Sequence, residues 1–482
     1  MLHSHHKVHF IGIGGIGMSS LAEILLSLGY EVSGSDLSLT EITHRLKLLG
    51  AEIHEGHSAE YLSEDTAMVV YSAAIDDCNS EMMRARERSI SCISRGEMLA
   101  DITRLKKNVV AVAGSHGKTT TTSMIDAIMQ WVDVESTAII GGTLVRHGTS
   151  TQWGGGDYLV VETDEHDGSF LKLAPTVSVV TNIDMEHVEY YKSLDDLKTS
   201  FLDFIHKVPF YGFSVLCDED PHIQDLLPEV TCQTIRYGLT EQADLSARDI
   251  QFSGDLNQAE TSFDVCNHNP SLGDLGVWGR VTIASLGTHN VLNALAALAT
   301  AVGLGMDFVS SQKGLKDFKG IRRRMQIFSL ENGATVVEDY AHHPTEIAAV
   351  LEAVKPMVKG LCHIVFQPHL YSRTQYFMKD FADVLQGADE VILLPIYPAR
   401  EAAIPGVTAE ALANIIEAKS HLSVQVLASF DEVLQEIQSS VQAEDTVLIL
   451  GAGDVYQVAE ALRACLKEVD WQEEAGRRKD SL

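Results

Sequence analysis

The sequence predicts an α/β protein with three domains. Its 482 residues are too many for one hydrophobic core and suit three domains of ordinary size. Two apolar strands run directly into a glycine-bearing turn and a helix start, and the last third of the chain repeats the order of strand, polar turn and helix. That alternation is typical of parallel, doubly wound sheets. We expect a Rossmann-like N-terminal domain at residues 1–105, a central domain with a phosphate loop on a parallel sheet at 106–317, and a Rossmann-like C-terminal domain at 318–482.

The composition argues against several classes of protein. A formal net charge of −31 disfavours nucleic acid or an acidic membrane surface as a partner, and the absence of any run of 18 apolar residues argues against membrane insertion. Seven cysteines are scattered without a Cys-x-x-Cys pair, which is typical of reduced thiols. The first seven residues lack the apolar stretch of a signal peptide. We therefore expect a cytoplasmic protein, monomeric or homodimeric, with small-molecule partners.

The first glycine turn matches a dinucleotide-binding fingerprint. A strand beginning at Val8 runs into Gly-x-Gly-x-x-Gly, a helical pattern follows from Met18 to Leu28, and a second strand leads to an acidic residue about twenty residues after the glycines. This pattern places a pyrophosphate on a helix N-terminus and a carboxylate near a sugar hydroxyl, which NAD and a UDP-sugar satisfy equally well. A glycine-tight turn without a ligand is the structural alternative. The candidate ligand-binding residues here, which the resemblance described below assigns to a UDP-sugar, are Gly12, Gly14, Gly15, Gly17, Asp36 and Ser72, which ends a later strand.

The second glycine turn has the layout of a phosphate loop. The apolar strand Val109–Ala113 leads into a polar turn, and a run of four threonines opens a helix. In such a loop, backbone N–H groups and the helix N-terminus face an anion, the lysine supplies a positive charge and the threonine hydroxyl reaches Mg²⁺. The strict pattern requires glycine at Val112, so this loop is a variant, and a structural turn is the alternative. The expected ATP-binding residues here are Gly114, Ser115, His116, Gly117, Lys118, Thr119 and Thr120.

Acidic residues and a histidine follow two later strands. The strand Tyr158–Thr163 delivers Glu162, and the strand Thr176–Thr181 is followed by His187. The carboxyl ends of parallel strands beside a phosphate loop are where α/β sheets bind ligands, and Mg²⁺ prefers oxygen ligands. We expect Glu162 to be a metal ligand with Thr119, and His187 to be a less conventional one. A solvated loop acid and a strand-end histidine bonded to backbone are the alternatives.

Two further clusters carry candidate nucleotide contacts. Residues 287–302 form an alanine-rich helix with polar side chains in its first turns, which are placed to read a purine edge; a helix cap is the alternative. Residues 318–324 are the densest cationic cluster of this acidic chain, suited to reaching ATP phosphates across a cleft, and a solvated linker is the alternative. The candidates in these clusters are His289, Asn290, Asn293, Arg323 and Arg324.

Taken together, the motifs of this chain resemble those of the Mur ligase family. That family also uses a phosphate loop without the first glycine, so the variant at Val112 fits the resemblance. The likeness covers nearly the whole chain, with nine motifs in the same order. They read GIGGIGM with SGSDL, AGSHGKTTTT, VVETDEHDGSFL, TNIDMEHVEYY, GTHNVLNALAA, FKGIRRRMQ, VEDYAHHPTE, FQPHLYSRTQ and IYPAREAAIPG.

The resemblance implies an ATP- and Mg²⁺-dependent ligase of peptidoglycan synthesis. Such an enzyme would join L-alanine to the carboxylate of UDP-N-acetylmuramate through an acyl phosphate, releasing ADP and phosphate. The three domains would bind the UDP-sugar, ATP and the amino acid in chain order. Three alternatives stay open: a related ligase that attaches a recycled tripeptide to the same sugar, an NAD-dependent dehydrogenase, and an inactive nucleotide-binding member.

The resemblance also implies roles for individual residues. Lys118, together with Mg²⁺ held through Thr119 and Glu162, would absorb charge on the phosphates, and His187 would bind a second Mg²⁺ near the acyl phosphate. Leu370 stands where some members carry arginine. The C-terminal candidates are Asp339 and Tyr340 for the nucleotide, and His342, His343, His369 and Arg373 for the cleft in which the acyl phosphate meets alanine. Those expected to be catalytic are Lys118, His187, His342, His343 and Arg373.

Overall fold

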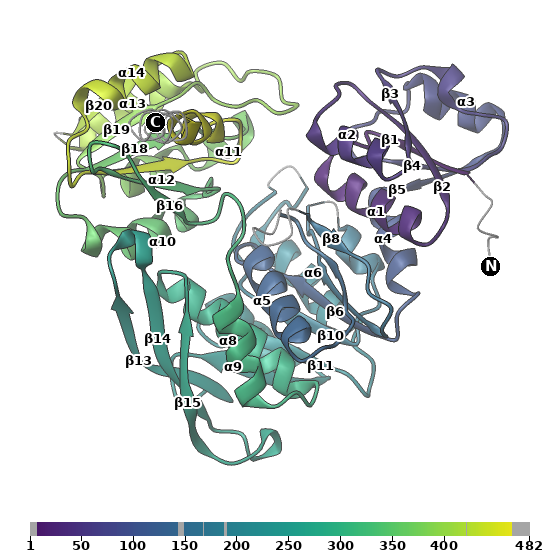
Figure 1. Ribbon diagram of the computed structural model, residues 1–482, viewed down its shortest axis with the longest axis horizontal. Coiled ribbons are helices and arrows are strands. Elements are labelled where there is room, and N and C mark those ends of the chain that lie inside the picture. Colours follow the sequence, from purple (N-terminus) through teal and green to yellow (C-terminus); the bar gives the residue numbers. More distant parts are fainter. Residues whose placement is uncertain (1–6, 143–148, 167, 188–189, 421, 465–482) are drawn as a thin grey trace, which may run out of the picture.

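The computed structural model describes residues 7–142, 149–166, 168–187, 190–420 and 422–464. These residues form three α/β parts, each built on its own sheet (Figure 1). The predicted fold class is therefore confirmed. Every helix within the described ranges is too short or too polar to cross a membrane. Most of the segment on which the expectation about a signal peptide rested lies outside the described residues.

The N-terminal sheet has five parallel strands in the order β3-β2-β1-β4-β5. Strand order reverses at β1, because β2 lies on one side of it and β4 on the other. In open α/β sheets, ligands bind at the carboxyl ends of the strands beside such a reversal, and the glycine turn after β1 lies at this position. The elements are β1 (Lys7–Ile11), α1 (Ile16–Ser27), β2 (Glu31–Asp36), α2 (Glu41–Leu48), β3 (Glu52–Glu55), β4 (Thr66–Tyr71), α3 (Ser80–Glu87), β5 (Ser91–Ser94) and α4 (Arg95–Thr103).

The central sheet has ten strands in the order β15-β14-β13-β12-β11-β10-β6-β9-β7-β8. Strands β13 to β7 of that order pair in parallel, as the sequence predicts for a phosphate-loop domain. The region that gave no clear sequence signal, residues 206–285, supplies an antiparallel extension of β13, β14 and β15. The elements are β6 (Asn108–Ala113), α5 (Lys118–Trp131), β7 (Thr137–Ile139), β8 (Thr151–Gln152), β9 (Tyr158–Glu162), β10 (Val177–Val180), α6 (Leu194–Ile205), β11 (Phe213–Cys217), α7 (Pro221–Leu226), β12 (Gln233–Gly238), β13 (Leu245–Ser253), β14 (Glu260–Asn267), β15 (Gly276–Ile283), α8 (Thr288–Gly303) and α9 (Phe308–Asp317).

The C-terminal sheet has six strands in the order β16-β17-β21-β18-β19-β20. All pairs are parallel except the edge pair of β16 and β17, which is antiparallel. The edge strands β16 and β20 are short and only partly buried, so they carry little of the apolar pattern by which a strand is recognised in sequence. The elements are β16 (Gln326–Ser329), β17 (Thr335–Asp339), α10 (Pro344–Val354), β18 (Cys362–Phe366), α11 (Tyr371–Tyr376), α12 (Met378–Leu385), β19 (Glu390–Leu393), α13 (Ala409–Lys419), β20 (Ser423–Val426), α14 (Phe430–Ser440) and β21 (Thr446–Leu450).

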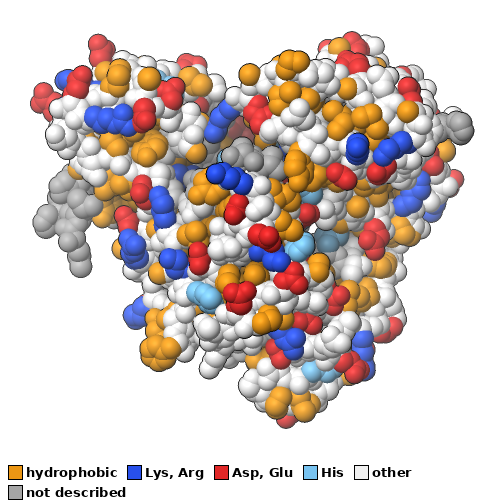
Figure 2. Space-filling model, turned by 180° about the vertical axis from the view of Figure 1, so that it is seen from behind, with side chains coloured by type: hydrophobic (Ala, Val, Ile, Leu, Met, Phe, Trp, Pro, Cys, Tyr) orange, Lys and Arg blue, Asp and Glu red, His pale blue; other side chains and the backbone are white. Residues whose placement is uncertain are grey.

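The N- and C-terminal domains both lie on the upper side of the central domain and face each other across a gap (Figure 1). The space-filling view from behind shows the same two lobes separated by a notch (Figure 2). One contiguous hydrophobic core runs through the N-terminal and central domains, and two further clusters fill the C-terminal domain, one of which also includes Leu256 and Leu286 of the central domain. Apolar contacts therefore cross both domain junctions.

A buried carboxylate in the phosphate-loop helix gives a stability prediction. Asp126 accepts hydrogen bonds from Ser136 Oγ (3.1 Å) and Gln130 Nε2 (2.5 Å), yet burial raises its pKa to about 6. Because this folded-state pKa lies above the ordinary value, the charged form costs stability above pH 6 and the cost disappears as pH falls toward 4. Asp126→Asn should raise the free energy of unfolding at pH 8 by about 2–3 kcal/mol. Thermal melts at pH 8 and pH 5 check this, with the exposed Asp203→Asn as control, and an unchanged or lower melting temperature at pH 8 would contradict it.

Candidate functional site

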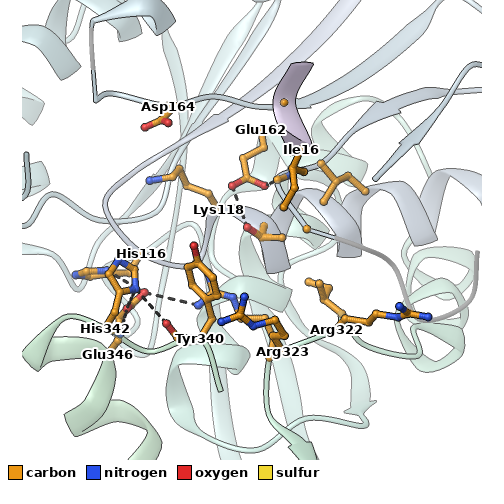
Figure 3. A pocket seen from close by; sticks show the side chains of 18 of the residues that line it. Ile16, His116, Lys118, Glu162, Asp164, Arg322, Arg323, Tyr340, His342 and Glu346 are labelled. Atoms are coloured by element: carbon orange, nitrogen blue, oxygen red, sulfur yellow. Dashed lines mark hydrogen bonds and ion pairs between the residues drawn. The ribbon is translucent and has the colours of Figure 1, made fainter. Parts of the chain in front are cut away.

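A cavity of about 970 Å³ lies where the three domains meet (Figure 3). The N-terminal domain contributes the first turn of α1, with Ile16 facing the same space as Lys118 and Glu162 of the central domain (Figure 3). The C-terminal domain closes the cavity with Tyr340 and Glu346. Glu162 is the last residue of β9, and Tyr340 directly follows β17. Ile16, Lys118 and Glu346 lie in the first turns of helices that follow parallel strands. A second cavity, of about 370 Å³, adjoins the first at His116, Gly117 and Arg324.

The phosphate loop joins β6 to α5 through two glycines that no other residue can replace without strain. Gly114 has φ +130° and lies against the Thr181 hydroxyl, and Gly117 has φ +82° with the Asn293 side chain only 2.5 Å from where its Cβ would be. Val112, where the strict motif has glycine, is instead fully buried within β6 and paired with both neighbouring strands. The strand thus continues through the position at which a standard loop would already have turned.

Lys118 is held at the mouth of the loop by a buried carboxylate. Its Nζ donates to the backbone oxygens of Gly114 (2.6 Å) and Ser115 (3.1 Å) and to both oxygens of Glu165 (3.0 and 3.1 Å). Burial by itself would lower the pKa of Lys118, but the charges of Glu165 and Asp164 outweigh burial and raise that pKa. The lysine is therefore charged at neutral pH and positioned to neutralise an anion in the cavity.

Two groups of oxygen and nitrogen donors beside Lys118 suit divalent cations. Glu162 accepts hydrogen bonds from Thr119 Oγ1 (2.9 Å) and from the backbone N–H of Gly141 (2.6 Å), and burial raises its pKa. Asp164, Glu165 and His187 form a second group, whose candidate ligand atoms all lie within 4.8 Å of one another. Crowded carboxylates repel each other, and a hard divalent cation with oxygen ligands relieves that repulsion. Both groups fit Mg²⁺, and they contain the three metal candidates of the sequence, Thr119, Glu162 and His187.

The loop histidine His116 bridges the central and C-terminal domains. Its Nε2 lies 3.1 Å from Asp184 Oδ2 and its Nδ1 lies 3.4 Å from Glu346 Oε1, which belongs to the first turn of α10. Burial would lower the pKa of His116, but Asp184 and Glu346 raise it to about 10. Thr345 reinforces the contact by donating its hydroxyl to Asp184 Oδ2 (2.7 Å). The imidazolium therefore acts as an ion-pair bridge between domains, while its backbone lies in the phosphate loop.

The predicted cleft residues of the C-terminal domain come together around Glu186. Arg373 Nη2 lies 3.8 Å from Glu186 Oε1, its Nη1 lies 3.3 Å from His369 Nδ1, and the His369 ring lies 5.9 Å from that of His342. Burial together with the charges of His342 and Arg373 lowers the pKa of His369 to about 3, so its ring is neutral at pH 7. His342 and Arg373 line the large cavity.

His343 and Leu370 lie where their contacts stabilise the local fold. The His343 ring packs on Phe377 (4.4 Å between centroids) and its Nδ1 accepts the Thr345 backbone N–H (3.3 Å), so it caps α10. Burial lowers its pKa to about 4. Leu370 has φ +69°, immediately before α11, and donates its backbone N–H to Tyr397 O (2.9 Å). Its side chain brings no charge to the cleft.

The two candidate arginines have different environments although they are neighbours in sequence. Arg323 donates through Nη2 to the backbone oxygens of Gly451 and Gly453 (both 2.9 Å) and lies between the rings of Tyr340 and Tyr456. Arg324 instead lies 3.6 Å from Glu346 and lines both cavities. Arg324 is consequently the better placed of the two for a nucleotide phosphate, because the guanidinium of Arg323 is occupied in holding the loop after β21.

The second cavity has the size and lining of a nucleoside pocket. His289, Asn290 and Asn293 line it at the start of α8, opposite Phe318 and Asp339. Burial lowers the pKa of His289 to about 4, so its ring is neutral. The two asparagine amides already have protein partners: Leu286 O accepts from Asn290 (2.7 Å), Asn290 Oδ1 accepts from Asn293 (3.1 Å), and Thr121 donates to Asn293 (3.2 Å). These bonds tie α8 to the phosphate-loop helix. Thr120 also lines this cavity.

The N-terminal glycine loop is shaped by Asp36. Its Oδ2 accepts the backbone N–H of Gly14 (2.8 Å), while the backbone oxygen of Ser35 accepts from Gly12 (2.8 Å). Ser72 packs against Gly12, 3.1 Å from where a Cβ would sit. Gly17 lines the three-domain cavity, and Gly15 is the N-terminal cap of α1. Asp36 therefore has a structural partner in addition to any sugar hydroxyl.

The fold and the site define a three-domain nucleotide-binding protein of the phosphate-loop type. The family model described as "Mur ligase family, catalytic domain" matches residues 7–107, "Mur ligase middle domain" matches 112–301, and "Mur ligase, glutamate ligase domain" matches 323–453. The chain belongs to the Mur ligase family.

Similar proteins resemble this chain over nearly its whole length. A UDP-N-acetylmuramate–L-alanine ligase of a Geobacter species is 46% identical over 463 residues, which cover 96% of this chain and 98% of the relative. A ligase of the same description from Syntrophobacter fumaroxidans is 45% identical, covering 97% of each chain. The crystal structure of UDP-N-acetylmuramate-alanine ligase from Thermotoga maritima matches with a TM-score of 0.80 at 28% identity, covering 96% and 100%. A murein peptide ligase from Psychrobacter arcticus matches with a TM-score of 0.72 at 26% identity, covering 96% and 98%.

Sequence reasoning gave no role to several charged residues that the structure places at the site. Asp184 and Glu186 follow the end of β10, so their position after a buried strand was an available signal. Glu346 lies in the first turn of α10, where an acid is common without any site, and Arg95 carries no local pattern that indicates a site. Their importance depends on partners from other domains, which a single sequence does not show.

The His116 bridge predicts a pH dependence of stability. Its folded-state pKa of about 10 lies above the ordinary value of roughly 6.5, so its stabilising effect is complete below pH 6.5 and is lost as pH rises toward 10. His116→Asn should therefore lower the melting temperature most at pH 6 and least at pH 10. Thermal melts across this range test it, with His206→Asn, at an exposed histidine, as control. A melting-temperature difference that stays constant with pH would contradict the charged bridge.

Proposed function

We propose that the protein is an ATP-dependent ligase that joins L-alanine to the carboxylate of UDP-N-acetylmuramate, releasing ADP and phosphate, as a cytoplasmic step of peptidoglycan synthesis. One observation carries the proposal. The fingerprint helix α1, the phosphate-loop Lys118 and the C-terminal Arg324 and His342 all line a single cavity. A nucleotide-sugar on α1 and ATP on the phosphate loop would there meet end to end. The relatives described as UDP-N-acetylmuramate–L-alanine ligases, at 43–46% identity, support L-alanine as the amino acid.

The first step brings together two anions, the sugar carboxylate and the γ-phosphate of ATP. Catalysis of such a transfer is mainly alignment and charge neutralisation. Lys118 would exchange its contacts with Glu165 for the β- and γ-phosphate oxygens, and Arg324 would approach them from the C-terminal domain. Mg²⁺, when bound by Thr119 and Glu162 and by the group around His187, would supply further positive charge. The carboxylate oxygen attacks the γ-phosphorus and ADP leaves.

The second step joins the acyl phosphate to the amino acid. The amine of L-alanine attacks the acyl carbon, loses a proton, and expels phosphate; we place the amine on the C-terminal side of the cavity. His342 and Arg373 line that side, and His369 supports the arginine. We assign Arg373 to the carboxylate of alanine. His289, Asn290, Asn293, Asp339 and Tyr340 are assigned to the nucleotide, and Gly12, Gly14, Gly15, Gly17, Asp36 and Ser72 to the UDP-sugar.

A ligase that attaches a tripeptide to the same sugar is the second candidate. The likeness to the murein peptide ligase of Psychrobacter arcticus motivates it. The two candidates differ in the amine and share every earlier step.

Substrate dependence of phosphate release distinguishes the two candidates. We expect turnover with ATP, Mg²⁺, UDP-N-acetylmuramate and L-alanine, and much weaker turnover with the tripeptide. L-Serine and glycine complete the panel, because an apolar pocket rejects one added hydroxyl only about 100-fold. Turnover that requires the tripeptide and ignores L-alanine would establish the second candidate instead. Phosphate release coupled to none of these amines would refute both.

The variant Lys118→Ala tests whether phosphate release requires the positive charge of Lys118. We expect phosphate release to fall by about 100- to 1,000-fold or more, because no other group replaces a cation aimed at the transferring phosphoryl group. Lys107→Ala is the matched control, since Lys107 is exposed and pairs with Asp157 away from the cavity. A near-normal rate for Lys118→Ala would overturn the assignment, provided that both variants melt at the wild-type temperature.

A further inference from the structure

The diphosphate of a UDP-sugar requires positive charge in a protein whose net charge is −31. The N-terminus of α1 supplies only partial charges, from backbone N–H groups and the helix dipole. Among the described residues of the N-terminal domain, Arg95 is the one lysine or arginine that lines the three-domain cavity. The full positive charge on this side of the cavity therefore comes from a residue outside the fingerprint.

Arg95 lies directly against the third glycine of the fingerprint. A Cβ atom on Gly17 would lie 3.0 Å from Nη1 and 3.1 Å from Cδ of Arg95, so the glycine makes room for the arginine. The arginine is the first residue of α4, and the capping box of Ser94 and Glu97 fixes its backbone. Its side chain is 28% exposed and borders the cavity. A helix start thus holds the guanidinium beside the start of α1.

The guanidinium of Arg95 makes few polar contacts with other described residues. Within the described ranges it makes one ion pair, with 3.8 Å between Nη2 and Asp164 Oδ2, and no hydrogen bond. Arg323, at the same cavity, instead donates hydrogen bonds to two backbone oxygens at 2.9 Å. A planar guanidinium carries several N–H donors in a fork that matches phosphate oxygens. Arg95 retains most of those donors for a ligand in the cavity.

We propose that Arg95 binds the diphosphate of the UDP-sugar together with the backbone N–H groups at the start of α1. This inference rests on the proposed function, which supplies the nucleotide-sugar. Arg95 is then a determinant of specificity for a nucleoside diphosphate over a nucleoside. Asp164, on the other side of the arginine, belongs with Glu165 and His187 to the donor group beside Lys118. Arg95 thereby also sets the position of the diphosphate relative to the phosphoryl-transfer centre.

Titration calorimetry with UDP and with uridine tests the proposal on the full chain. Arg95→Gln should weaken UDP binding by about 10- to 100-fold, as expected when charge-assisted hydrogen bonds are lost. It should leave uridine and ATP binding unchanged. Arg95→Lys should restore part of the UDP affinity, and the dependence of that affinity on salt should be weaker in Arg95→Gln. Arg104→Gln is the matched control, because Arg104 follows the same helix and pairs with Asp101 on the surface.

Two results would overturn the proposal. UDP affinity of Arg95→Gln equal to that of the wild type would show that the diphosphate does not contact Arg95. An equal loss of UDP, uridine and ATP affinity would show that the arginine only maintains the fold. A wild-type protein that binds ATP but not UDP would instead refute the nucleotide-sugar assignment itself, and this outcome is recognised without any variant.

Discussion

Buried ion pairs determine how the charged side chains are arranged around the cavity between the three domains. Lys118 pairs with Glu165, and Arg373 pairs with Glu186. His116 pairs with both Asp184 and Glu346. Each cation faces the region where anionic substrates would collect, and each is balanced by a carboxylate until they arrive. Burying an unpaired charge is costly, so a site for several phosphates in an acidic protein needs such internal counter-ions. The same carboxylates form the donor groups that suit divalent cations.

The three sheets make this arrangement possible because each delivers loops at the carboxyl ends of its strands. The start of α1, the phosphate loop after β6, the acids at the ends of β9 and β10, and the loop after β17 all reach one cavity. Main-chain hydrogen bonds within the sheets fix where each strand ends, so the loops start from rigid positions. Packing of α8 against α5, with Asn293 bonded to Thr121, holds the phosphate loop from behind.

The junction between the central and C-terminal domains combines apolar contacts with ion pairs. The N-terminal and central domains share one hydrophobic core, whereas the C-terminal domain meets the phosphate loop through His116, Thr345 and Glu346. Apolar burial is insensitive to ligand charge, but an ion-paired junction responds directly to an arriving phosphate. The ionic contacts of the C-terminal domain therefore lie at the phosphate loop, where Arg324 adds a further one with Glu346.

The sequence by itself determined the strands, the turns and the chemistry that each loop carries. The two glycine loops were located from the sequence, because glycine, lysine and threonine spacings act over a few neighbouring residues. The tertiary structure alone decided the partners. Arg323 and Arg324 are adjacent and both line the large cavity, yet the left-handed backbone at Arg323 (φ +61°) accompanies a side chain bound to the loop after β21, while Arg324 also lines the second cavity. The roles of Glu186 and Arg95 likewise depend on residues far away in the chain, because electrostatic pairing acts through space rather than along the sequence.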